Sequence, residues 1–313
     1  DFCLSRGLGD VYKRQGYNTS KIPDTFYGGL RMKKVDLHVH STYSDGTNTP
    51  KELIKLAENE GLSAIALTDH DTLDGIPDAL DAAKNSSVEL IPGVELSTNF
   101  NNTEVHIVGL FLDHNNKQIN DYLIYQRQSR IDRNIQMCQK FCDIGINITY
   151  DKMCELYPDA VITRAHFADY LVKNKYTGDR NEAFDRYLSP GKPCFVNRHK
   201  VDPEEAIAVI HKAHGAAILA HPVLYHLGKD QMNALLEHVC NAGIDGIEAI
   251  YSTYKPADER YIRKIATEHK LLISGGSDYH GANKPNIKLG RGLGHLFVPY
   301  EVLEKLSEKA SEY

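Results

Sequence analysis

The sequence of 313 residues lacks the features that mark membrane and secreted proteins. No stretch approaches the roughly 18 consecutive apolar residues of a membrane span, and the N-terminus has no apolar core of a signal peptide. The six cysteines form no Cys-x-x-Cys pair, which argues against a zinc knuckle or a redox dithiol. We therefore expect a reduced, cytoplasmic setting and no membrane partner.

An excess of positive charge is also missing. The formal net charge is −6, which argues against a protein whose main task is to grip long duplex DNA. A hydrophobic content of 42% and a charged content of 25% are ordinary for a soluble globular protein. This length suits one large domain, or a domain with a substantial insertion.

Residues 1–31 differ from the rest of the chain because they are Gly-rich and weakly patterned. Met32 then begins a run that is typical of a protein start. We expect residues 1–31 to be a disordered leader or extension outside the fold.

From Met32 onward, short apolar runs alternate with amphipathic helical patterns. The alternation predicts an α/β fold with a parallel sheet and helical crossovers, over residues 32–112 and 201–313. Strands are expected at residues 35–40, 63–68, 88–95, 105–111, 216–220, 246–250 and 271–274, and helices at 50–60, 76–83, 203–213, 231–242 and 257–269.

Residues 113–200 are mostly helical in pattern and contain no convincing buried strand. We interpret them as an inserted helical cap. Residues 161–200 contain eight Lys and Arg residues and four Asp and Glu residues, which gives this segment a formal net charge of +4. This balance fits either a solvated helix face or an anion-binding lid.

Two histidines lie two residues apart in the first predicted strand. His38 and His40 project from the same face, because side chains alternate along a strand. The turn at Ser-Asp-Gly then carries Asp45 on the loop that leaves this strand. Such a pair also arises by chance, so further ligands must decide whether a metal site begins here.

Further candidate ligands lie in or just after the other strands, which is the region where functional groups converge in parallel sheets and barrels. The complete set is His38, His40, Asp45, His70, Glu95, His106, His221, Asp278 and His280. Nine groups are too many for one ion, so we expect two or three divalent ions. Nitrogen and oxygen donors without thiolate suit zinc, manganese and iron alike, whereas so many imidazoles disfavour magnesium or calcium. Among these three metals we expect manganese first, with zinc or iron as alternatives.

A cluster of ions has a plain chemical use. Two ions about 4 Å apart can generate a hydroxide near neutral pH and neutralise charge on a phosphoryl group. Because stabilising that transition state is mainly electrostatic, hydrolysis of a phosphoester fits the ligand set best.

Five motifs, taken together and in order, resemble the PHP (polymerase and histidinol phosphatase) superfamily of metal-dependent phosphoesterases. They are His38-Val39-His40-Ser41 with Ser44-Asp45-Gly46, Thr68-Asp69-His70-Asp71, Pro92-Gly93-Val94-Glu95, Ala220-His221-Pro222 and Gly276-Ser277-Asp278-Tyr279-His280-Gly281. The resemblance runs from about Lys33 to about Gly294. It implies a distorted (β/α)7 PHP barrel that holds a trinuclear cluster.

The resemblance also implies how the ligands divide. One ion would be held by His38, His40, Glu95 and Asp278; a second by Glu95, His106 and His221; a third by Asp45, His70 and His280. A metal-bound hydroxide held by Glu95, His106, His221 and Asp278 would attack the phosphorus.

Within the superfamily, the helical insertion most resembles the nucleoside bisphosphate phosphatase branch, which also includes an exonuclease acting on the 5′ ends of short RNA. We therefore expect hydrolysis of the 3′-phosphate of nucleoside 3′,5′-bisphosphates. The alternatives are 5′-to-3′ cleavage of short 5′-phosphorylated RNA, an amidohydrolase-type reaction and metal binding without catalysis. The candidate substrate-binding residues in the cap are Arg164, His166, Lys192 and Arg198. The oligomeric state stays open.

Overall fold

The computed structural model describes the chain except for residues 1–25, 28–29, 32 and 198–200. Two compact units divide the chain at residues 33 and 34. In the first unit, strand β1 (Phe26–Tyr27) pairs antiparallel with strand β2 (Leu30–Arg31). The other residues of the segment 1–31, which we expect to be disordered, lie outside the described residues.

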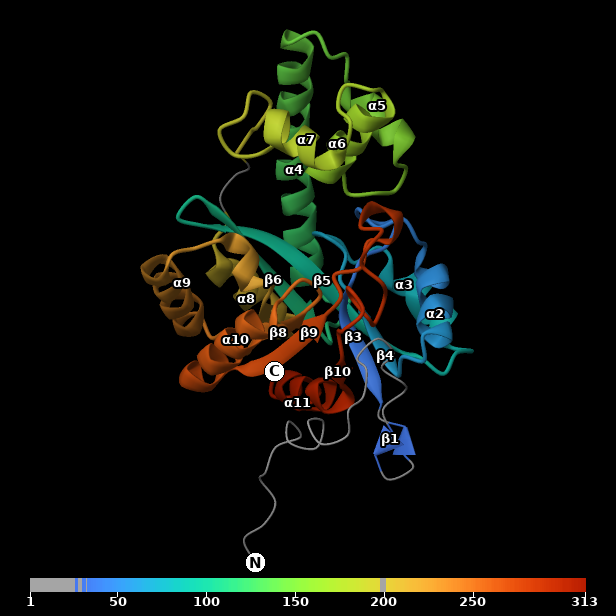
Figure 1. The fold of residues 1–313 in the computed structure, drawn as a ribbon, viewed down its shortest axis with the longest axis vertical. Coiled ribbons are helices and arrows are strands. Elements are labelled where there is room, and N and C mark those ends of the chain that lie inside the picture. The colour runs from blue at the N-terminus through green and yellow to red at the C-terminus, as the bar shows by residue number, and fades with distance from the viewer. Residues whose placement is uncertain (1–25, 28–29, 32, 198–200) are drawn as a thin grey trace, which may run out of the picture. The chain divides into compact units, whose positions relative to one another are not determined.

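The second unit is built on one mixed sheet, whose strands are ordered β10-β3-β4-β5-β6-β7-β8-β9 over the described residues (Figure 1). The strands are β3 (Lys34–Val39), β4 (Ala64–Leu67), β5 (Glu89–Phe100), β6 (Thr103–Leu110), β7 (Ala216–Leu219), β8 (Gly246–Tyr251), β9 (Leu272–Gly276) and β10 (Val298–Pro299).

The sheet curls into a nearly closed barrel because the segment after β9 returns to β3. The amide of His40 donates to the carbonyl of Tyr279 at 3.0 Å, and the amide of Asp278 donates to the carbonyl of His38 at 2.9 Å. Gly276 allows this approach, since a Cβ at that position would collide with His38. The predicted α/β barrel class is confirmed.

The expectation of a parallel sheet fails at β6, which pairs antiparallel with both β5 and β7. Strands β5 and β6 form a hairpin that turns at Asn101 and Asn102, whose φ angles are 47° and 65°. Asparagine tolerates this left-handed conformation, which two-residue hairpin turns require. The absence of a helical pattern between the two predicted strands was the available signal for a hairpin.

Helices flank the barrel, with α2 and α3 on one side and α8, α9 and α10 on the other (Figure 1). Helix α2 begins with a capping box, in which the Thr49 amide donates to Glu52 Oε2 at 2.8 Å, and Pro50 follows as its first residue. Among the described residues, no helix is both long and apolar enough to cross a membrane. The bounds are α2 (Pro50–Asn59), α3 (Ile76–Ala83), α8 (Pro203–Lys212), α9 (Lys229–Asn241), α10 (Pro256–His269) and α11 (Tyr300–Ala310).

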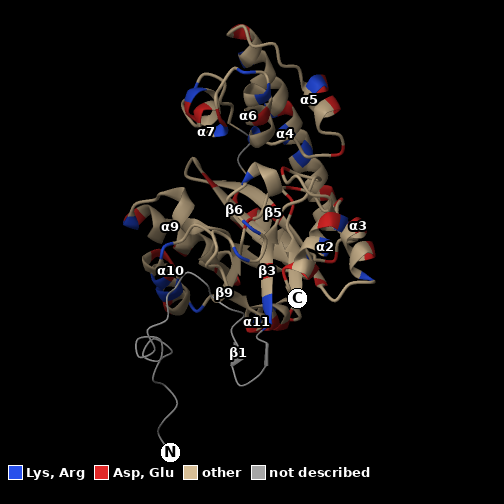
Figure 2. Cartoon of the chain, turned by 45° about the vertical axis from the view of Figure 1, so that its right-hand side comes forward, with Lys and Arg blue, Asp and Glu red and all other residues tan. Residues whose placement is uncertain are grey.

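The described chain between β6 and α8 is mostly helical. Its elements are α4 (Lys117–Asp143), α5 (Tyr150–Leu156), α6 (Arg164–Lys173), α7 (Arg180–Ala183) and the π-helix η1 (Phe184–Leu188). Phe141 and Phe167 stack within an apolar cluster that these helices share. Lys, Arg, Asp and Glu are intermixed over α5, α6 and α7 (Figure 2). That residues 113–200 form a subdomain separate from the barrel stays a prediction, because residues 34–313 make one compact unit.

Polar contacts join the cap to the loops at the carboxyl end of the barrel. Arg130 of α4 forms a buried ion pair with Asp71. Thr163 Oγ1 donates to Asp45 Oδ2 at 3.1 Å, one residue before α6 begins. These contacts hold the cap over the strand ends at which the candidate ligands lie.

Candidate metal centre

The barrel brings all nine predicted ligands to one region. His38 lies in β3, Glu95 in β5 and His106 in β6, and the remaining six follow the ends of β3, β4, β7 and β9. The local backbone is unusual at two of them, because Asp278 and His221 have φ angles of 53° and 28°. Non-glycine residues rarely adopt this left-handed region, and such strain concentrates at functional sites.

Glu95 is the centre of the cluster and is almost fully buried. Its Oε2 lies 3.1 to 3.3 Å from three ring nitrogens, those of His70, His40 and His38. Its Oε1 lies 2.8 Å from His106 Nδ1 and 2.9 Å from His221 Nε2. Five imidazoles therefore converge on one carboxylate, which is the arrangement expected of a residue that bridges metal ions.

Two further carboxylates complete the cluster. Asp45 Oδ1 lies 3.1 Å from His280 Nε2, and Asp278 Oδ1 lies 3.4 Å from His40 Nε2. Four groups could each hold an ion: His40, Asp45, His70 and His280; His38, His40 and Asp278; His38, Glu95 and His221; and His70, Glu95 and His106. The first contains the whole predicted third ligand set. His38, His40 and His70 also fit groups to which the resemblance did not assign them.

Buried atoms without hydrogen-bond partners show that the cluster suits cations. They include the Nε2 atoms of His38 and His40, Nδ1 of His70 and Oδ1 of Asp45. A buried polar atom left unsatisfied costs about 1–3 kcal/mol, and metal ions held by these groups would satisfy such atoms. These nitrogen and oxygen donors fit divalent manganese, zinc or iron.

The electrostatics favour bound cations as well. Burial raises the pKa of Glu95, but the charges of His70, His106 and His38 outweigh this effect and hold the pKa well below its usual range. Burial lowers the pKa of His106, but the charge of Glu95 and the hydrogen bonds to Glu104 and Glu95 raise it to about 10. The Glu95 carboxylate is therefore ionised, and positive charges around it stabilise this form.

Other buried acids orient the ligands. Glu248 Oε1 lies 3.1 Å from His38 Nδ1, and Glu248 Oε2 accepts the His221 amide at 2.8 Å. Asp69 accepts the Ser41 amide at 2.8 Å and the Ser44 hydroxyl at 2.5 Å, which fixes the loop that carries Asp45. Such partners set the tautomer and direction of metal-binding imidazoles.

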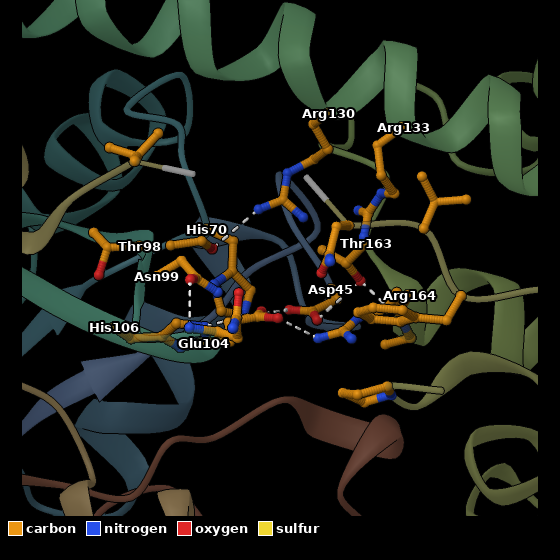
Figure 3. Close-up of a pocket in the computed structure, with 18 of the residues that line it drawn as sticks. Asp45, His70, Thr98, Asn99, Glu104, His106, Arg130, Arg133, Thr163 and Arg164 are labelled. Atoms are coloured by element: carbon orange, nitrogen blue, oxygen red, sulfur yellow. Dashed lines mark hydrogen bonds and ion pairs between the residues drawn. The ribbon is translucent and has the colours of Figure 1, made fainter. Parts of the chain in front are cut away.

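A pocket of about 220 Å³ opens from the cluster towards the cap. Asp45, His70 and His106 form its floor, and Arg130 and Arg133 of α4 project into it (Figure 3). Arg164 enters from the start of α6. Three arginines thus lie over a cluster that is itself built for cations, an arrangement suited to a ligand with more than one negative group.

The four predicted substrate-binding residues fare differently. Arg164 lines the pocket, and its guanidinium carbon lies 5.6 Å from the centre of the Phe195 ring. Lys192 is exposed and is not among the residues that line the pocket. Arg198 lies outside the described residues.

His166 is buried and caps a helix. Its Nδ1 accepts the Thr163 amide at 2.9 Å in a capping box at the start of α6. It is only 3% exposed, and it is also absent from the pocket lining. The capping hydrogen bond gives His166 a structural role that needs no substrate. Binding of substrate by His166 therefore stays a prediction, and the geometry does not favour it.

Protonation of His166 is expected to destabilise the fold. Burial lowers its pKa from 6.5 to about 4, and an Nδ1 that accepts a hydrogen bond must be unprotonated. Because the folded pKa lies below the unfolded one, this contribution is complete above pH 6.5 and is lost as the pH falls towards 4. The loss at pH 5 should reach about 2 kcal/mol.

Urea unfolding at about pH 7.5 and about pH 5 measures this effect. The control is His166→Gln, since glutamine at this position keeps a capping acceptor without titrating. The wild type should lose more stability than the variant on acidification. Equal losses would show that His166 does not drive the change.

Several residues of the site escaped sequence analysis. Arg130 and Arg133 lie within the long helix α4. Two arginines three residues apart share one face of a helix, and in sequence such a face resembles one exposed to solvent. Glu104 was detectable in principle, because it precedes His106 by two residues on the same strand and must share its face.

Comparison with known proteins extends across most of the chain. The profile of the PHP domain matches residues 36–218. A 5′-3′ exoribonuclease of Haemophilus influenzae is 39% identical over 248 residues, which cover 79% of this chain and 90% of that protein. A 3′,5′-nucleoside bisphosphate phosphatase of Chromobacterium violaceum is 34% identical over 267 residues, with coverage of 84% and 92%.

Solved structures agree with the sequence matches. A protein of Bifidobacterium adolescentis assigned as a metal-dependent phosphoesterase superimposes with a TM-score of 0.77 and 28% sequence identity. The match covers 88% of this chain and 95% of that structure.

Proposed function

Because the chain belongs to the PHP domain family and is a metal-dependent phosphoesterase, we propose that it removes the 3′-phosphate of nucleoside 3′,5′-bisphosphates. One observation carries the proposal: a pocket lined by three arginines opens directly onto the nine-residue cluster. The pocket suits a non-scissile phosphate while the cluster acts on the other phosphate. The relative from Chromobacterium violaceum that is named for this activity supports the same substrate class.

The nine clustered side chains would hold two or three divalent ions, and we propose manganese first, with zinc or iron as alternatives. When bound, such ions supply positive charge to the phosphoryl group and acidify water. Glu95 would supply negative charge to more than one such ion, and Glu248 lies against the His38 ring and would keep it in place.

The cap residues contribute binding and orientation. Arg164 can donate two parallel hydrogen bonds to the second phosphate, a geometry that guanidinium groups favour. Arg130 is held by Asp71 and by Ser97 Oγ at 3.1 Å, so its position is fixed before substrate binds. A fixed second phosphate orients the scissile one and raises the rate without contact with the reacting atoms.

The setting of the enzyme is also proposed. The described cysteines Cys138, Cys142, Cys154, Cys194 and Cys240 are all free, which agrees with a reduced, cytoplasmic compartment. The partners would be small nucleotides or short RNA rather than long duplex DNA.

Cleavage of short 5′-phosphorylated RNA is a second candidate, favoured by the exoribonuclease relative. The chemistry is shared, because the 5′-phosphate would occupy the arginine pocket in both reactions. The 3′-oxygen of the first nucleoside would leave in both reactions, as the 3′-hydroxyl of a 5′-mononucleotide. The reactions differ in the phosphoryl group, which becomes inorganic phosphate in one case and the 5′-phosphate of the shortened RNA in the other.

The test is product-resolved hydrolysis by manganese-loaded protein of adenosine 3′,5′-bisphosphate, AMP and a 5′-phosphorylated RNA trimer. We expect conversion of the bisphosphate to AMP, and turnover of AMP slower by about a hundredfold or more. Stepwise release of mononucleotides from the trimer at a comparable rate would favour the exonuclease. Equal turnover of AMP and the bisphosphate would contradict a role for the second phosphate.

A further inference from the structure

A carboxylate lies inside the pocket that we assign to a phosphate. Glu104 lies on β6, two residues before His106, and lines the pocket (Figure 3). Its Oε2 is 2.5 Å from Arg164 Nη2, and its Oε1 is 3.3 Å from His106 Nε2. One side chain thus connects an arginine of the cap to a candidate metal ligand of the barrel.

A carboxylate at this position weakens the binding of phosphate to the pocket. A carboxylate close to the second phosphate repels it, and at the same time occupies the guanidinium that should bind it. Asp71, the partner of Arg130, differs from Glu104 because it is fully buried and does not line the pocket. Glu104 keeps 47% of its side chain exposed, so a ligand can reach the Glu104–Arg164 pair.

The contact with His106 gives Glu104 a second partner to which it can turn. His106 directs Nδ1 at Glu95, at 2.8 Å, and Nε2 at Glu104. A carboxylate on the outer nitrogen of a metal-binding imidazole fixes its tautomer and orientation. A Glu104 released from Arg164 would bond more closely to His106.

We propose that Glu104 is a positioning residue that occupies Arg164 in the absence of substrate and is replaced there by the second phosphate of the substrate. On replacement, Glu104 bonds His106 alone, so phosphate binding in the cap also orients a ligand of the metal centre. This inference rests on the proposed function for the identity of the phosphate. In this proposal the second phosphate has two roles: it anchors the substrate in the cap, and its binding is needed for Glu104 to orient His106.

The first test measures binding without turnover. Calorimetry gives the affinity of inorganic phosphate for the metal-free wild type, Glu104→Gln, Arg164→Ala and the double variant. Glu104→Gln should bind phosphate about three- to tenfold more tightly, because the amide neither repels the anion nor neutralises Arg164. The gain should vanish in the double variant, since it requires Arg164.

The matched control is Asp74→Asn. Asp74 pairs with Arg127, another arginine of α4, in a different pocket lined by Tyr43 and Tyr150. This variant should bind phosphate as the wild type does. Equal affinity of the wild type and Glu104→Gln, including no measurable binding by either, would overturn the role of Glu104.

The second test separates binding from orientation in the metal-loaded enzyme. Glu104→Gln should lower KM for adenosine 3′,5′-bisphosphate but not for adenosine 3′-monophosphate, and should lower kcat for the bisphosphate through His106. An ion pair with a purely structural role would change both substrates alike, which would contradict the proposal. If neither nucleotide is a substrate while Glu104→Gln still binds phosphate more tightly through Arg164, the proposed function fails and the role of Glu104 stands.

Discussion

Replacing Glu95 by Gln is expected to lower phosphate release by about a thousandfold or more, because metal ions supply several kcal/mol of transition-state stabilisation. Glu95 is the only carboxylate in the described cluster that lies within 3.3 Å of five imidazoles. The amide keeps the size of the side chain and removes the charge between neighbouring cations. Bound manganese, measured by elemental analysis, should fall together with activity.

Glu89→Gln is the matched control for this variant, since Glu89 begins the same strand but is exposed and accepts a hydrogen bond from Tyr300 at 2.8 Å. It should retain metal and activity. Thermal unfolding of both variants checks that the fold is kept. Full activity of Glu95→Gln with a normal metal content would exclude Glu95 as the bridging ligand.

Replacing Arg164 by Ala is expected to lower kcat/KM for adenosine 3′,5′-bisphosphate by about a hundredfold, since a charge-assisted hydrogen bond contributes about 1.5–3 kcal/mol. The loss for adenosine 3′-monophosphate should be far smaller, because that substrate has no second phosphate. Steady-state kinetics on the two nucleotides measures the ratio.

Arg127→Ala controls for the general loss of positive charge near the cap, because Arg127 pairs with Asp74 outside the arginine-lined pocket. Its effect on both substrates should be small. An equal loss for the two substrates in Arg164→Ala would show that Arg164 does not bind the second phosphate.

Local pattern was sufficient to predict most of the barrel. The helix over residues 76–83 follows its apolar spacing, and α2 begins at Pro50 as its capping box predicts. The antiparallel placement of β6 depends on a hairpin whose turn residues, Asn101 and Asn102, are common in loops of every kind.

The candidate ligands were predictable for a related reason. A residue at the end of a barrel strand reaches the same edge whatever the details of packing, so His70 and His221 needed no tertiary knowledge. Residues that act from helices are different, because their direction depends on how the helix lies. Arg133 of α4 is only 6% exposed, although its sequence context resembles a surface.

The most direct measurement is anomalous diffraction at the manganese edge from crystals of the manganese-loaded protein. Two or three peaks should lie among the nine clustered side chains, with Glu95 between neighbouring peaks. Peaks at other positions, or a manganese-loaded active enzyme with none in the cluster, would contradict the assignment of these residues as the metal centre.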